Sequence, residues 1–75
     1  MSYSQWLEHQ EGYIYGINDR FLNKATNDLL VYYINTYRKQ KNAYIRGMVS
    51  AAVMILRGRK EQEEFASVKT KTVSH

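Results

Sequence analysis

The sequence predicts an all-helical fold, and three observations lead to this prediction. The 75 residues include no proline and only four glycines, a composition that suits long helices and not a turn-rich β fold. Apolar residues recur at alternating steps of four and three over two long segments, which is the period of a helix with one apolar face. A short stretch rich in Asn, Asp and Thr separates these segments, and such residues favour turns and helix caps. We therefore expect two or three helices in one domain over residues 1–65.

The first helix is expected over residues 3–21. Its apolar stripe, interrupted once by a glutamine, consists of Tyr3, Leu7, Ile14, Ile17 and Phe21. Ser2 and Gln5 have the spacing of a capping box, in which each side chain accepts a hydrogen bond from the other residue's backbone N–H. Gly12 and Gly16 share one face of this helix. Either another backbone approaches that face closely, or one of the two glycines marks a kink or the end of the helix.

The connection that follows is expected to provide the cap of the next helix from one of three residues: Asn23, Thr26 or Asn27. From Leu30 onward the helical alternation leaves two architectures open. In one, a single helix covers residues 28–65 and forms a hairpin that needs a second chain to cover its apolar stripe. In the other, the chain turns near Lys41, Asn42 caps a third helix, and the product is a small three-helix bundle. The continuous helix is favoured, because residues 38–42 include no Gly or Pro and are mostly good helix formers.

Residues 48–56 are apolar on nearly every side of a helix, with Ser50 as the sole polar residue. A helix that is apolar all round is buried all round, and in a single short chain only a helix flanked by the others achieves this. A chain of this size buries only about 60% of its unfolded surface, and it has no cysteine for a disulfide. We therefore expect an oligomer, most simply a homodimer. The predicted self-association interface is Tyr37, Tyr44, Met48, Val49, Ala52, Val53, Ile55 and Leu56.

Tyrosine is unusually frequent, at seven of 75 residues. Its large ring and polar hydroxyl suit contact surfaces that are only partly desolvated, although an ordinary bundle core filled with tyrosine is the alternative. Together with the apolar segment, this favours a non-enzymatic protein–protein interaction, adaptor or regulatory protein that acts as a homodimer. Docking on a larger protein partner is also compatible with the pattern.

A small basic nucleic-acid-binding regulator is the alternative function, because the net charge is +4 and basic residues alternate with aromatic ones. The candidate phosphate contacts are Arg38, Lys39, Lys41, Arg46, Arg57, Arg59 and Lys60. The acidic run at residues 61–64 opposes the second half of this set, and no tight turn is placed for a helix-turn-helix. Protein interaction is therefore the preferred interpretation.

No catalytic, metal or cofactor site is predicted. There are no cysteines, and the two histidines lie at opposite ends of the chain. His9 is interpreted as a solvated surface residue, and a bundle of this size is expected to lack room for a small-molecule pocket. No apolar run reaches the roughly 20 residues of a membrane span, and the start of the chain lacks the pattern of a secretory signal. We therefore expect a cytoplasmic protein without membrane contact, with a disordered tail over residues 66–75.

Overall fold

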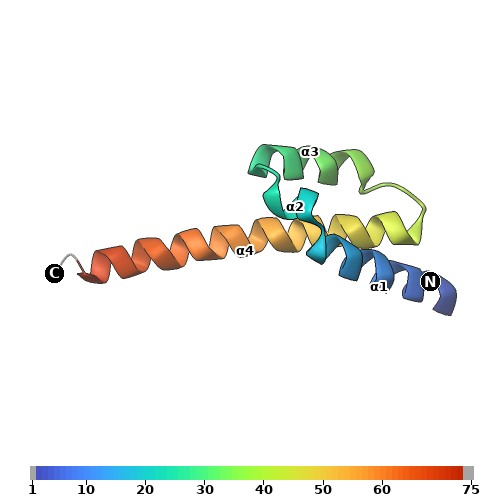
Figure 1. The fold of residues 1–75 in the computed structure, drawn as a ribbon, viewed down its shortest axis with the longest axis horizontal. Coiled ribbons are helices and arrows are strands. Elements are labelled where there is room, and N and C mark those ends of the chain that lie inside the picture. Colours follow the sequence, from blue (N-terminus) through green and yellow to red (C-terminus); the bar gives the residue numbers. More distant parts are fainter. Residues whose placement is uncertain (1, 74–75) are drawn as a thin grey trace.

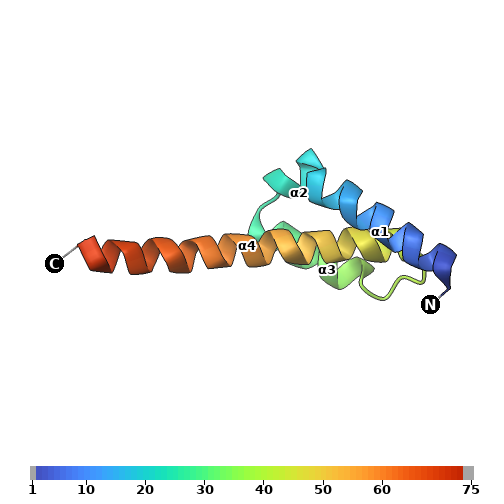
Figure 2. The ribbon, with the colours of Figure 1, turned by 90° about the horizontal axis from the view of Figure 1, so that it is seen from below.

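The computed structural model describes the backbone of residues 2–73 and the side chains of residues 2–64. Over this range it contains four helices: α1 (Tyr3–Asn18), α2 (Arg20–Lys24), α3 (Asn27–Tyr37) and α4 (Ala43–Val73). The predicted all-helical fold is thus confirmed, with one helix more than the three-helix alternative. Figure 1 shows α4 as the central element, with α3 on one side of its first half and α1 on the other. The view turned by 90° agrees that α1 and α3 lie on different sides of α4 (Figure 2).

Helix α1 begins at the predicted capping box. The Gln5 backbone N–H donates to Ser2 Oγ at 3.2 Å, and the Ser2 N–H donates to Gln5 Oε1 at 3.0 Å. The helix predicted over residues 3–21 is divided, however, because Asp19 adopts an extended backbone and caps a new helix. The Asp19 carboxylate accepts a hydrogen bond from the Leu22 N–H at 3.2 Å, so α2 starts in a new direction. This local cap accounts for the fourth helix.

The chain also turns between α3 and α4, so the favoured continuous helix over residues 28–65 is wrong. Thr26 caps α3 through a hydrogen bond from the Leu29 N–H, and residues 38–42 then separate Tyr37 from Ala43. Asn42 Oδ1 accepts from the Ile45 N–H at 3.1 Å and begins α4, as the bundle alternative expected. A cap of this kind stabilises a helix start by about 1 kcal/mol. The turn lets α3 fold back onto α4 within a single chain.

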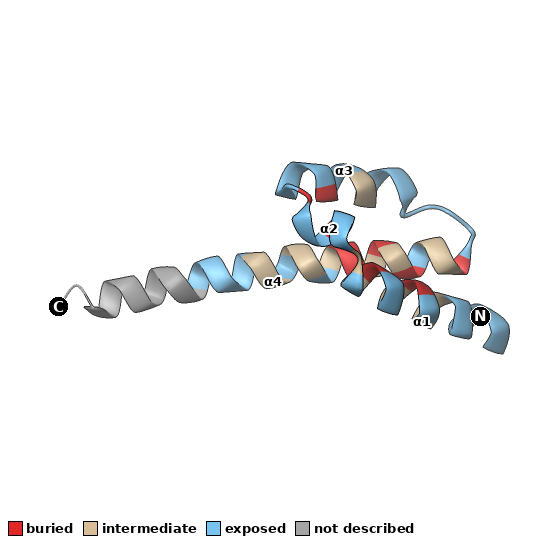
Figure 3. Cartoon of the chain, viewed as in Figure 1, coloured by how far each residue is buried: buried red, intermediate tan, exposed pale blue. Residues whose placement is uncertain are grey.

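The core is small and lies between α2, α3 and the middle of α4. Leu22 and Leu30 are its two large, fully buried side chains, and Ala25 and Ala52 complete the buried cluster. Figure 3 shows the buried residues of α4 where it meets α1 and α2. Within the segment predicted to be buried all round, Val49, Ala51 and Ala52 are buried, while Met54 is 42% exposed. The neighbours of α4 in the same chain therefore account for most of this apolar segment.

Helix α1 packs on α4 through glycine. A Cβ atom at Gly12 would collide with the Tyr44 carbonyl group, and one at Gly47 would collide with the His9 carbonyl group. A Cβ atom at Gly16 would lie only 2.7 Å from the Ala51 Cβ. Of the two readings of Gly12 and Gly16, the close backbone approach is therefore confirmed, and α1 continues past both glycines. Because α1 turns this glycine face toward α4, its apolar stripe turns away.

The boundary predicted at residue 65 falls where the described side chains end. The predicted tail over residues 66–75 lies outside the residues whose side chains the structure describes. The division of the chain into a domain and a tail therefore stays a prediction.

Candidate protein interaction surface

The outer face of α1 carries four exposed apolar side chains. Tyr3 is 73% exposed, Ile14 is 58% exposed and Trp6 is 49% exposed, with Leu7 beside them. The rings of Tyr3 and Trp6 stack with their centroids 6.1 Å apart and an interplanar angle of 19°. Stacked rings lose little freedom on binding, because each ring already restricts the other. An exposed apolar strip of this kind is typical of a surface that contacts another molecule.

The charges of α1 border this strip on one side. Glu8 and Glu11 are both exposed, and α1 contains no Lys or Arg. All 11 Lys and Arg residues of the chain lie outside α1, so α1 is the acidic helix of a basic protein. The opposite border of the strip is uncharged and includes Gln10 and Tyr13, which are half-buried toward α4.

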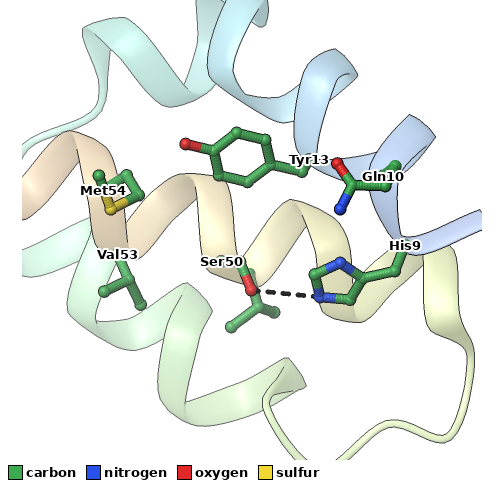
Figure 4. A pocket seen from close by; sticks show the side chains of 7 residues that line it. His9, Gln10, Tyr13, Ser50, Val53 and Met54 are labelled. Atoms are coloured by element: carbon green, nitrogen blue, oxygen red, sulfur yellow. Dashed lines mark hydrogen bonds between the residues drawn. The ribbon is translucent and has the colours of Figure 1, made fainter. Parts of the chain in front are cut away.

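A groove of about 450 Å³ runs between this second border and α4. Its lining residues are His9, Gln10, Tyr13, Val49, Ser50, Val53 and Met54. Figure 4 shows the imidazole of His9 turned toward the hydroxyl of Ser50 at one end of the groove, with Val53 and Met54 at the other. The expectation that His9 is a solvated surface residue, and that no pocket forms, is therefore corrected. The reason is that α1 approaches α4 closely enough to hold the ring between the two helices.

The contact between His9 and Ser50 joins α1 to α4. Ser50 Oγ donates to the Arg46 carbonyl oxygen at 3.1 Å, and it lies 3.4 Å from His9 Nε2. The Ser50 hydroxyl has one proton for these two neighbours, and the tautomer of His9 sets which of Ser50 and His9 donates. The pair therefore serves to fix the two helices against each other.

A second hollow of about 290 Å³ lies on α2 and α3 and is rich in aromatic rings. Its lining residues are Phe21, Leu22, Ala25, Leu29, Leu30, Tyr32, Tyr33 and Tyr37. The rings of Tyr33 and Tyr37 lie 4.9 Å apart, and Phe21 and Tyr32 are largely exposed at the rim. Burial raises the pKa of the Tyr33 phenol above 10.0, and the nearby Tyr37 and Asp19 raise it further. The ring is thus held in partly desolvated surroundings.

Four of the eight residues predicted to form a self-association interface contribute to contacts inside the chain. Val49 and Ala52 are buried, and Ala52 belongs to the core cluster. Ile55 and Leu56 are half-buried and pack against the same cluster. The core of the single chain therefore uses this part of α4.

The other four predicted interface residues lie on different faces. Tyr44 and Met48 provide the backbone surface on which the α1 glycines rest. Val53 lines the groove between α1 and α4, while Tyr37 lines the aromatic hollow of α2 and α3. The structure therefore distributes the eight residues over several faces, and their contact with a second chain stays a prediction.

Of the seven predicted nucleic-acid contacts, four come together at one end of the molecule. Arg38, Lys39, Lys41 and Arg46 are all exposed around the turn between α3 and α4. Arg57 and Lys60 are exposed farther along α4 and away from this turn. The turn thus carries a concentrated positive charge.

Arg59, the seventh of these residues, has a structural position that the sequence did not indicate. Its guanidinium donates to the Ala25 carbonyl at 2.6 Å, to Asn27 Oδ1 at 2.9 Å and to the Asn23 carbonyl at 2.8 Å. These three bonds tie α4 to the connection between α2 and α3. The Arg59 side chain is therefore engaged in the fold.

The part of the chain that the structure describes has neither a metal-binding cluster nor a membrane-spanning helix. Within the described part of the chain, no group of three His, Asp or Glu side chains is placed to bind a metal ion. Every helix in that part is too short or too polar to cross a lipid bilayer. Comparison of the chain with protein-family models, with curated proteins and with solved structures finds no match.

Proposed function

We propose that this chain is a non-enzymatic helical protein–protein interaction protein that acts as a homodimer. The exposed apolar surface of its first three helices carries the proposal. Among the described side chains, ten large apolar ones on residues 3–37 are at least 37% exposed, whereas α4 adds only Met54. Single exposed apolar residues are ordinary, but a surface on which they gather marks a contact site.

Covering this surface would add hydrophobic stabilisation to a chain whose own core is small. Of the described side chains, Leu22 and Leu30 are the two large ones buried almost completely. Removing apolar surface from water contributes about 25 cal/mol per Å². A standard interface that buries roughly 800 Å² on each partner would therefore add a contribution that a chain of this size needs. A second copy carries the same exposed surface, which makes self-association the simplest way to cover it.

Sedimentation equilibrium of the purified chain tests this proposal. We expect a monomer–dimer equilibrium with a midpoint between about 1 and 100 µM, the range of a standard but partly polar interface. Replacing Tyr3 and Ile14 with serine should shift the equilibrium toward monomer. The control is replacement of Asn35 and Gln62, which are exposed and polar, with serine. A chain that stays monomeric up to several hundred micromolar would contradict the homodimer.

Binding to nucleic acid is the second candidate, and the cluster of exposed cations at the α3–α4 turn favours it. Lys41 and Arg46 line a hollow of about 370 Å³ together with Gln5 and Ala43, a geometry in which two cations can reach one phosphate. Fluorescence anisotropy with duplex and single-stranded DNA and with RNA at low salt is the test. Binding through the turn should weaken as salt rises, and it should be lost when the four cations are replaced with glutamine. Replacing Arg57 and Lys60 is the matched control, because these cations lie elsewhere.

A further inference from the structure

We propose that the aromatic hollow of α2 and α3 binds an unpaired base of a single-stranded nucleic acid, and that the cations on either side of the hollow bind the phosphates of the strand. This inference goes beyond the homodimer. It rests on the second candidate function, nucleic-acid binding, and names the kind of strand and the residues that bind it. Figure 1 shows that α2 and α3 lie together on one side of α4 and that the α3–α4 turn continues from the end of α3.

The aromatic hollow presents ring faces to the solvent. Four of its eight lining residues are aromatic, and two of these, Phe21 and Tyr32, are largely exposed at the rim. Aromatic side chains bind the bases of single strands by stacking, whatever the sequence, because every base has a π-face. The volume of about 290 Å³ is close to the lower end of the roughly 300–1,000 Å³ of small-molecule pockets, which suits a single planar base. Within a duplex both faces of a base are covered by its stacked neighbours, so the hollow selects an unpaired base.

Exposed cations lie at both ends of the aromatic hollow. At one end, Arg20 and Lys24 line a neighbouring hollow that shares three lining residues with it. At the other end, Tyr37 lines the aromatic hollow, and the exposed Arg38 and Lys39 follow it directly in the chain. Helix α3, which runs between the two ends, has 11 residues and is roughly 16 Å long. A strand of about five nucleotides therefore spans both pairs of cations at roughly 3.4 Å per nucleotide.

The charge of this surface favours a nucleic acid over a second copy of the chain. Residues 19–41 include five basic residues and two acidic ones, so their net charge is +3. One of the acids, Asp19, is engaged in the cap of α2 through the Leu22 N–H. A second copy docked on the hollow would bring the same cations together, whereas the phosphates of a nucleic acid neutralise them and release counterions. Charge complementarity thus selects the strand as the occupant.

Fluorescence anisotropy with the full chain at low salt tests the inference. The probe is a labelled 12-nucleotide oligothymidylate, either alone or annealed to its complement. We expect the single strand to bind roughly tenfold or more tightly than the duplex, because only the single strand can place a base on the rings. The logarithm of its affinity should fall with the logarithm of the salt concentration with a slope of about −3, since four phosphate contacts contribute about −0.7 each.

Variants of Tyr32 test the stacking itself. Tyr32 is 67% exposed, so its replacement removes little packing. Tyr32→Leu keeps an apolar side chain but removes the ring, and it should raise the dissociation constant of the single strand roughly 5- to 100-fold. Tyr32→Phe keeps the ring and should bind within about twofold of the natural chain. The matched control is Tyr3→Leu, because Tyr3 is an equally exposed ring on α1, and it should leave the constant unchanged.

The cations of α2 provide an independent measurement. Replacing Arg20 and Lys24 with glutamine should make the salt slope shallower by about 1.4, which corresponds to two lost phosphate contacts. The same replacement of Arg57 and Lys60, which are exposed on α4, should leave the slope unchanged. An unchanged slope in the α2 variant would show that the phosphates are bound at the turn alone, which overturns the path of the strand across the hollow.

The outcomes separate this inference from the functions proposed above. If neither the strand nor the duplex binds, nucleic-acid binding and this inference both fall, while the homodimer stands or falls by sedimentation. If binding depends on the cations of the turn but not on Tyr32, or if the duplex binds as tightly as the strand, nucleic-acid binding stands and the base site is overturned. If Tyr32→Leu weakens the dimer and leaves binding of the strand unchanged, the hollow is a protein contact and the inference is overturned.

Discussion

Helix α4 has two contact regions that are built in opposite ways. On one side, α1 rests on it through Gly12, Gly16 and Gly47, so that backbone lies against backbone. On the other side, α2 and α3 contact it through Leu22 and Leu30, which fill the space between the elements. The first region buries a face that has almost no side-chain volume, and the second buries the largest apolar side chains of the core.

This difference determines what each region tolerates. Close backbone contact is stabilised by many small dispersion contacts and fails when atoms are added. A leucine core is stabilised by apolar burial and fails when atoms are removed. The packing of α1 through glycine also explains its exposed apolar face, because the apolar residues of α1 are not used in the contact with α4.

We call the contact of α2 and α3 with α4 through Leu22 and Leu30 the leucine region. Removing side-chain volume from it should have the largest effect on stability. Leu30 is 0% exposed, so Leu30→Ala should lower the free energy of unfolding by about 3 kcal/mol, through lost burial and the cavity left behind. Leu29→Ala is the control, since Leu29 is 40% exposed, and it should cost less than about 1 kcal/mol. Urea unfolding followed by circular dichroism at one protein concentration measures both. Equal losses for the two variants would show that Leu30 is not the centre of the core.

We call the contact of α1 with α4 through Gly12, Gly16 and Gly47 the glycine region. Adding side-chain volume to it should have the next largest effect on stability. Gly47→Ala should cost about 2 kcal/mol, because the added methyl meets the His9 carbonyl and the Tyr13 nitrogen of the α1 backbone, which cannot move aside independently. Gly58→Ala is the matched control in the same helix, where a Cβ meets nothing within 4 Å. It should stabilise the chain by about 1 kcal/mol through helix propensity.

Hydrogen exchange would show whether the glycine region can open independently. In Gly47→Ala, amides of α1 should lose more protection than amides of α3, because only α1 depends on the glycine contact. Uniform loss across α1 and α3 would indicate that the two regions unfold as one unit and that the contrast between them is only geometrical.

Removing the hydrogen bonds by which Arg59 joins α4 to the α2–α3 connection should lower stability by a smaller amount. Arg59→Met keeps the apolar stem but removes three hydrogen bonds, one of them to a carbonyl of buried Ala25, and should cost about 1–2 kcal/mol. Arg57→Met, at an exposed position two residues earlier, should stay within about 0.5 kcal/mol of the natural chain. If both variants unfold at the same urea concentration, the hydrogen bonds of Arg59 contribute nothing to the stability of the leucine region.

The sequence predicted those parts of the fold that depend on local hydrogen bonds. The box of Ser2 and Gln5 and the cap at Thr26 each need only residues three positions apart. The turn before Asn42 was harder, because residues 38–42 are mostly good helix formers. The cap at Asn42 and the burial of Leu30 against α4 together favour the reversal. The bonds of Arg59 join residues more than 30 positions apart, so no local pattern indicates them.

The candidate surface was predicted less well than the fold. An apolar stripe was evident on α1, but hydropathy cannot tell whether such a stripe faces its own core or another molecule. The deciding fact is that Gly12 and Gly16 lie against Tyr44, Met48 and Ala51 of α4, while Gly47 lies against the α1 backbone. Glycine has no hydropathic signal for such packing. The apolar segment 48–56 therefore suggested an interface on α4, while the largest exposed apolar residues lie on α1, α2 and α3.

The smallest predicted effect concerns pH and applies only to the leucine region. Tyr33 packs against the core cluster, and its pKa is raised above 10.0 by burial, by Tyr37 and by Asp19. In the unfolded chain the phenol ionises first, so above about pH 10 the unfolded state binds fewer protons and stability falls as pH rises. Tyr33→Phe should therefore lose less stability between about pH 9 and 11 than the natural chain, after the difference at neutral pH is subtracted. Urea midpoints across this range measure the change, and an equal alkaline loss in both proteins would show that Tyr33 is no more desolvated in the fold than in the unfolded chain.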